Sequence, residues 1–202
     1  MSEYFPLLLL LAVSVFISKK SEQRRRITLL GGYLSRYDLE KNMATVTEGY
    51  LRALGEKEAD RRAQVWRHLE PTEVQLGAQF AKFSQDFAQV PEPAARVSTL
   101  PVGLPYATAL FAQASFDVRQ MFAVHARGLS QTVALPAAES PRAKAFRMMA
   151  EMMLMQHTCH WFCNSRAVAS ARLQARHHTS HEQVLAAVSP ETRAAYRQLT
   201  GI

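Results

Sequence analysis

An apolar run near the start of the chain ends abruptly in a cluster of basic residues. Tyr4 to Ser18 reads YFPLLLLLAVSVFIS, carries no charged side chain, and is followed at once by lysines and arginines. A helix of this length covers about 22 Å, somewhat less than a hydrocarbon core of about 30 Å. Lysine stems that reach the interface and local bilayer thinning can make up the difference. The sequence therefore predicts a single-pass transmembrane anchor in residues 1–18.

Two other interpretations of this run remain open. A cleaved signal peptide is disfavoured because positive charge should precede the run, whereas Glu3 precedes it here. The nearest small-residue cleavage pattern, Ala12 to Ser14, also lies inside the run. A buried helix of a soluble protein would need complete burial of Leu7 to Leu11, because that stretch is apolar on every face.

The basic cluster sets the expected orientation. Lysine and arginine beside a span favour the cytoplasmic side, so we expect the N-terminus outside and the body in the cytoplasm. The same residues would contact the anionic headgroups of a lipid bilayer, each contributing about 1 kcal/mol. These candidate headgroup residues lie in an expected juxtamembrane linker at 19–34, and they are Lys19, Lys20, Arg24, Arg25 and Arg26.

Composition narrows the class of protein further. The net charge is +7, with 24 basic against 17 acidic residues, and the basic cluster supplies much of the excess. The body is thus only mildly basic, and its aromatic residues fall in apolar stripes rather than among basic ones, so we expect no nucleic-acid partner. Two cysteines do not make a disulfide framework.

Apolar residues of the body recur at helical spacing. Four stripes predict the main helices, and they run over 39–54, 76–90, 111–129 and 145–173. A polar helix is expected at 57–69, and Pro71 is expected in the first turn of the next helix. Ser140 should cap the long helix of the last stripe, Ser180 a short helix, and Ser189 the final helix. Prolines exclude a continuous helix over 91–105 and break the chain again at 136–141. Residues 35–202 should therefore form an all-α antiparallel bundle of about four main helices with extra short ones.

One cluster has the residue types of a metal site. Cys159, His160 and Cys163 follow several methionines, and helical geometry lets all three face one direction, which would suit copper(I) or zinc. Core packing explains the same residues, because Cys159 lies in the apolar stripe and a buried cysteine behaves as a small hydrophobe. A redox-sensing thiol is the third interpretation. His125 also lies on an apolar stripe, which predicts a hydrogen-bonded core histidine.

The sequence favours a non-enzymatic, membrane-tethered interaction or adaptor protein at the cytoplasmic face, acting in a protein complex. No catalytic motif is recognisable, and no cofactor is expected. The candidate contacts for a protein partner lie in the proline-rich stretch and at a charged position in the last long stripe; they are Leu100, Val102, Leu104, Tyr106 and Arg166. A metal- or redox-linked protein using Cys159, His160 and Cys163 is the alternative, and an enzyme without local motifs stays open.

Overall fold

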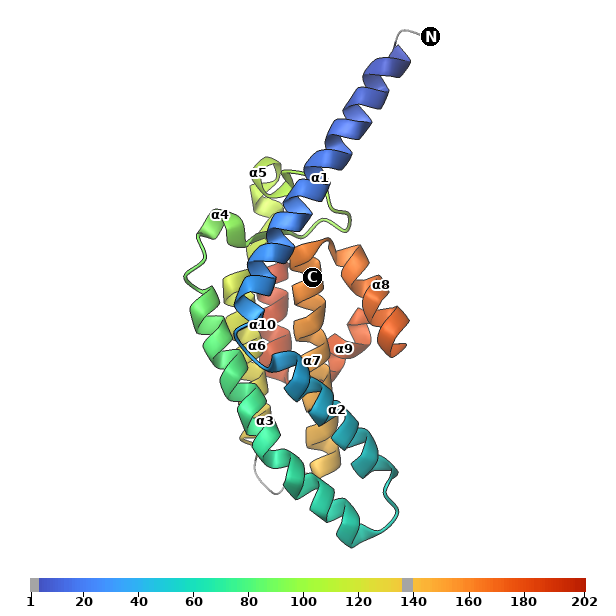
Figure 1. The fold of residues 1–202 in the computed structure, drawn as a ribbon, viewed down its shortest axis with the longest axis vertical. Coiled ribbons are helices and arrows are strands. Elements are labelled where there is room, and N and C mark those ends of the chain that lie inside the picture. The colour runs from blue at the N-terminus through green and yellow to red at the C-terminus, as the bar shows by residue number, and fades with distance from the viewer. Residues whose placement is uncertain (1–3, 136–139) are drawn as a thin grey trace.

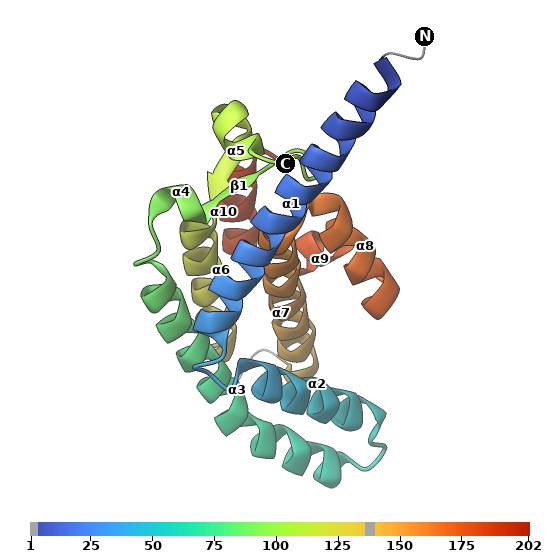
Figure 2. The ribbon, with the colours of Figure 1, turned by 45° about the horizontal axis from the view of Figure 1, so that its top comes forward.

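The computed structural model describes residues 4–135 and 140–202 and is predominantly helical, which confirms the all-α prediction. Three long helices form the centre of the bundle: α3 (Ala59–Phe87), α6 (Val118–Val133) and α7 (Pro141–Cys163). The helix α2 (Leu39–Gly55) packs on α3 at one end, and α10 (Pro190–Thr200) packs on α6. Two shorter helices, α8 (Arg166–His177) and α9 (His181–Ala187), pack against α7. Figures 1 and 2 show this bundle with its N-terminal helix extending beyond it.

The first helix, α1 (Tyr4–Leu34), is continuous through the residues expected to form a linker at 19–34. Its C-terminal half lies against α7 and α3, where Leu30 is buried and Tyr33 packs edge-on to Phe87 at 5.1 Å. Its N-terminal half projects away from the body (Figure 1). Within the residues that the structure describes, no helix is long and apolar enough to cross a membrane. The predicted transmembrane span is therefore not supported.

Aromatic side chains from three helices form the centre of the core. Phe80, Phe83 and Phe87 recur on one face of α3, as the stripe predicts, and are fully buried. They pack on Phe122 of α6 with ring centroids 5.1–6.2 Å apart. Phe162 of α7 packs edge-on to Phe87 at 6.0 Å. Edge-to-face pairs of this kind add about 0.5–1.5 kcal/mol each beyond the area they bury.

Some helix boundaries differ from the prediction. Pro71 lies inside α3 rather than at the start of a new helix, and its ring faces solvent while Leu69 and Glu73 on either side are buried. The stripe expected over 145–173 is interrupted after Cys163, because Asn164 leaves the helical conformation and Ser165 begins α8 by accepting a hydrogen bond from the Val168 amide. Arg166 is thus the first residue of α8, and not part of a continuous core stripe.

The segment between α3 and α6 contains the short elements. It includes α4 (Glu92–Ala95), β1 (Arg96–Ser98), α5 (Ala107–Leu110), the 3₁₀ turn η1 (Ala112–Ala114) and β2 (Ser115–Asp117). The two strands pair antiparallel, with Val97 opposite Phe116. Ser140, Ser180 and Ser189 cap their helices as predicted. The expected break at 136–141 falls mostly on residues 136–139, outside the described residues.

Candidate functional site

The projecting half of α1 exposes apolar side chains on every side. Five consecutive leucines, Leu7 to Leu11, are all more than half exposed, and consecutive helical residues point about 100° apart, so no face is polar. The large apolar residues between 40% and 67% exposed are Leu7, Leu8, Leu9, Leu10, Leu11, Val13, Val15, Phe16 and Ile17. Covering nine such side chains would contribute on the order of 10 kcal/mol or more. An apolar surface of this size marks a site of contact with lipid or with another molecule.

The basic residues after the apolar run do not share one environment. Lys20, Arg24 and Arg25 are exposed, and the Lys20 ammonium lies 5.8 Å from the Phe16 ring centroid. Lys19 is half-buried and lines a pocket between α1 and the body. Exposed cations directly below an apolar surface suit anionic headgroups.

Arg26 differs from the other basic residues because it joins α1 to the body. Its guanidinium donates to the Phe162 carbonyl at 3.1 Å and to the Arg96 carbonyl at 3.2 Å, and it pairs with Glu22 at 2.8 Å. It also lies over the Phe162 ring, 5.4 Å from the centroid. We therefore assign Arg26 to the joint between α1 and the bundle rather than to headgroup contact.

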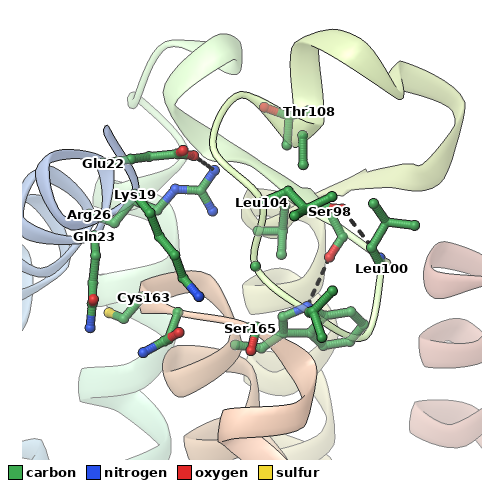
Figure 3. Close-up of a pocket in the computed structure, with 16 residues that line it drawn as sticks. Lys19, Glu22, Gln23, Arg26, Ser98, Leu100, Leu104, Thr108, Cys163 and Ser165 are labelled. Atoms are coloured by element: carbon green, nitrogen blue, oxygen red, sulfur yellow. Dashed lines mark hydrogen bonds and ion pairs between the residues drawn. The ribbon is translucent and has the colours of Figure 1, made fainter. Parts of the chain in front are cut away.

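A small pocket lies where α1 meets the proline-rich stretch. Figure 3 shows Lys19, Glu22 and Arg26 of α1 on one side and Ser98, Leu100 and Leu104 on the other, with Cys163 and Ser165 below. Its volume of about 40 Å³ leaves room for little more than water, so it does not suit a substrate. The pocket is instead the seam that fixes the proline-rich stretch against α1.

Hydrogen bonds hold the same stretch to α7 and α8. The Trp161 indole N–H donates to the Ser98 carbonyl at 2.9 Å, and the Ala167 amide donates to the Pro101 carbonyl at 3.0 Å. On the α1 side, the Tyr106 amide donates to a carboxylate oxygen of Glu22 at 3.3 Å. Tyr106 has a positive φ of 57°, which is unusual for a bulky residue. The hydrogen bonds of the surrounding stretch hold its backbone in this conformation. The stretch is therefore a fixed part of the surface.

The residues expected to contact a partner lie in two places. Val102, Leu104 and Tyr106 are exposed on the proline-rich stretch, whereas Leu100 is half-buried in the pocket wall. Arg166 is half-exposed on α8 and is not among the pocket residues. The sequence stripe placed Phe111 in a core helix, yet it is exposed, as is its neighbour Leu110. No charged residue occurs between Arg96 and Asp117, and this feature of the sequence could have identified Leu110 and Phe111 as part of an exposed apolar surface.

The structure gives no support to a metal site at Cys159, His160 and Cys163 within the residues that it describes. Among the described residues, no group of three His, Cys, Asp or Glu side chains could hold a metal ion. Burial raises the pKa of the Cys159 thiol to about 12 and that of Cys163 to about 11, which disfavours the thiolate that a redox-sensing cysteine needs. The His160 Nδ1 accepts a hydrogen bond of 3.0 Å from Arg172. The alternative metal or redox interpretation is therefore not supported.

The cysteines instead lie along a groove on the outer face of α7. Ile27 and Leu34 of α1, Met43 of α2, and Cys159 and Cys163 of α7 are among its lining residues, and its volume is about 370 Å³. Arg172 and Arg176, one helical turn apart on α8, stand at its edge and are exposed. Flexible, polarizable methionine side chains are typical of surfaces that bind varied apolar segments. The groove is large enough to take such a segment beside two cations.

Three histidines lie in the bundle interior, of which sequence reasoning anticipated one. His125 bonds through Nε2 to Thr158 Oγ1 at 2.8 Å, which confirms the expected core histidine. His157 bonds to Ser170 Oγ at 3.1 Å and stacks on His181 with ring centroids 4.4 Å apart. Burial lowers the pKa of His125 and of His157 to about 3, so both rings are neutral. These three rings therefore belong to the core.

Comparisons with known proteins find no relative of this chain. No protein-family model matches the chain, and neither curated proteins nor solved structures yield a similar protein.

Proposed function

We propose that this protein is a membrane-tethered helical adaptor, held at a membrane surface by the projecting half of α1. The observation that supports this proposal is a contrast between the two halves of α1. Before Ser18 the helix exposes apolar side chains on every face, and after Arg26 it packs into the core of the bundle. A protein partner would offer a one-sided groove, whereas lipid surrounds a helix on all sides. Lys20, Arg24 and Arg25 then lie at headgroup level, and their charge favours the cytoplasmic face.

Flotation with liposomes tests the tether. The full chain, mixed with vesicles of phosphatidylcholine and phosphatidylglycerol, should float with them through a density gradient. The variant Leu8→Asp/Leu11→Asp should stay at the bottom, because a charge inside hydrocarbon costs about 2.5–3.5 kcal/mol for each aspartate. The matched control Leu51→Asp/Val74→Asp changes two apolar residues of the body that are also more than half exposed, and it should float normally. Equal flotation of all three proteins would refute the tether.

For the adaptor role, we propose that the groove on α7 binds an apolar segment of another protein that carries acidic residues. Its apolar lining and the pair of arginines at its edge support this choice of partner. A photo-cross-linking residue at Ile27, which lines the groove and is 48% exposed, should give one discrete adduct in native membranes. Charge reversal by Arg172→Glu/Arg176→Glu should abolish it, and the same probe at Leu51 should give none. An adduct that survives charge reversal would exclude this site.

A further inference from the structure

A second apolar surface lies at the end of the body from which α1 projects. The stretch Val102–Phe111, here called the α5 segment, forms that end beside α1 (Figures 1 and 2). Its large side chains are exposed by 44–71%, and they are Val102, Leu104, Tyr106, Leu110 and Phe111. No charged residue occurs anywhere between Arg96 and Asp117. A surface loop facing only water would carry charges, so this composition indicates a covered surface.

The α5 segment touches α1 at the point where its apolar run ends. A Cβ placed on Gly103 would lie 3.4 Å from Cε of Lys19, the first charged residue after the run. One turn further along α1, Glu22 accepts the Tyr106 amide hydrogen bond at 3.3 Å. If α1 is inserted up to Lys19, these contacts place the α5 segment at the boundary between headgroups and hydrocarbon. Tyrosine is enriched at that boundary because its ring is apolar and its hydroxyl polar.

The α5 segment also has the rigidity needed to act as a contact. The Tyr106 amide joins it to Glu22 of α1. The residues just before it are held as well, because the Ser98 carbonyl accepts from Trp161 of α7 and the Pro101 carbonyl accepts from Ala167 of α8. Its exposed side chains therefore lose little backbone freedom on binding, and the free energy of their burial is largely retained.

From this arrangement we propose that the α5 segment is a second membrane contact, which seats its apolar side chains in the lipid interface beside α1. The proposal rests on the tether proposed above. One inserted helix alone would leave the body free to tilt about it, whereas two contacts on one rigid body fix its orientation. The surface that sequence reasoning assigned to a protein partner, Val102 to Tyr106, is in this proposal covered by lipid.

Tryptophan fluorescence in vesicles with brominated acyl chains tests the second contact. In the full chain bound to such vesicles, the tryptophan of Phe111→Trp should be quenched strongly. That of Leu51→Trp, which is 60% exposed on α2 at the far end of the body, should not be quenched. The unmodified protein supplies the background from Trp66 and Trp161. An unquenched Phe111→Trp on protein that floats would overturn the second contact and leave the tether standing, whereas failure to float would refute the tether.

An affinity measurement gives a second readout. Leu110→Asp/Phe111→Asp removes two of the largest apolar side chains from the proposed interface and should weaken vesicle binding at least about tenfold, because each buried side chain contributes about 1.5 kcal/mol or more. The matched pair Leu51→Asp/Phe146→Asp should bind as the unmodified protein does. Unchanged affinity of the first variant, with unaltered helicity, would show that a protein partner or solvent covers the α5 segment.

Discussion

Arg26 of α1 caps the C-terminal end of α7 by donating a hydrogen bond of 3.1 Å to the Phe162 carbonyl. The last carbonyls of a helix have no partner within it, and a cation there also complements the negative end of the helix dipole. The capping group comes from a residue 136 positions away in the sequence. A single side chain thus couples the projecting helix to the centre of the bundle.

Replacing Arg26 should therefore loosen α1 from the body. We expect Arg26→Gln to lower the free energy of unfolding by about 2 kcal/mol, since hydrogen bonds to a charged group contribute about 1.5–3 kcal/mol and this side chain is only 15% exposed. Amide exchange in the second half of α1 should accelerate. Arg25→Gln, at an exposed position one residue earlier, should change stability by less than about 0.5 kcal/mol. Equal effects of the two substitutions would contradict the assigned cap.

Two buried glycines in helix interiors should respond to alanine in opposite ways. A Cβ on Gly128 of α6 would collide with the Glu151 carboxylate and the Thr192 hydroxyl, so Gly128→Ala should destabilise by about 1–3 kcal/mol. On Gly77 of α3, a Cβ would meet only Val133 at 3.5 Å, an ordinary contact. Gly77→Ala should then stabilise by up to about 1 kcal/mol through helix propensity. Urea unfolding of both variants measures the difference, and effects of the same sign would count against the packing described here.

A buried carboxylate links three helices, and its removal should be costly. Glu73 of α3 accepts from the Tyr50 hydroxyl of α2 at 2.7 Å and pairs with Lys144 of α7 at 2.6 Å. Glu73→Ala leaves both groups without that partner and should lower stability by about 3–5 kcal/mol. Glu70→Ala, exposed one turn earlier on the same helix, is the control and should have little effect in thermal or chemical unfolding.

The interior histidines should make stability depend on pH. Their folded-state pKa of about 3 lies below the unfolded value of about 6.5, so the unfolded chain alone gains protons as the pH falls from about 6.5. Each of His125 and His157 should then reduce stability by about 1.4 kcal/mol per pH unit. Burial raises the pKa of Glu151, which acts in the opposite sense where that group titrates. His125→Gln should make the decline shallower, while exposed His68→Gln should leave it unchanged.

Local signals in the sequence predicted much of the fold. Ser140, Ser180 and Ser189 cap helices because each precedes a helical pattern and its hydroxyl can accept an amide hydrogen bond. The phenylalanine stripe of α3 likewise reports its buried face directly. These features depend on residues within one or two helical turns of each other, so they can be recognised from the sequence alone.

Features set by distant contacts could not be predicted in this way. Pro71 stays inside α3 because packing on both sides outweighs the local cost of proline. Arg26 looked like its basic neighbours, and only the fold distinguishes it by bringing Phe162 and Arg96 within hydrogen-bond distance. For the candidate site, the exposure of Val102, Leu104 and Tyr106 was expected, whereas the contact of their segment with Lys19 and Glu22 depends on tertiary structure.

In the proposed arrangement, lipid covers the first half of α1 and not the second. Tryptophans placed at Leu9 and at Ile27, which are 54% and 48% exposed on the same helix, compare the two halves directly in vesicles with brominated acyl chains. We expect strong quenching of Leu9→Trp and little of Ile27→Trp. No quenching at either position, or equal quenching at both, would contradict it.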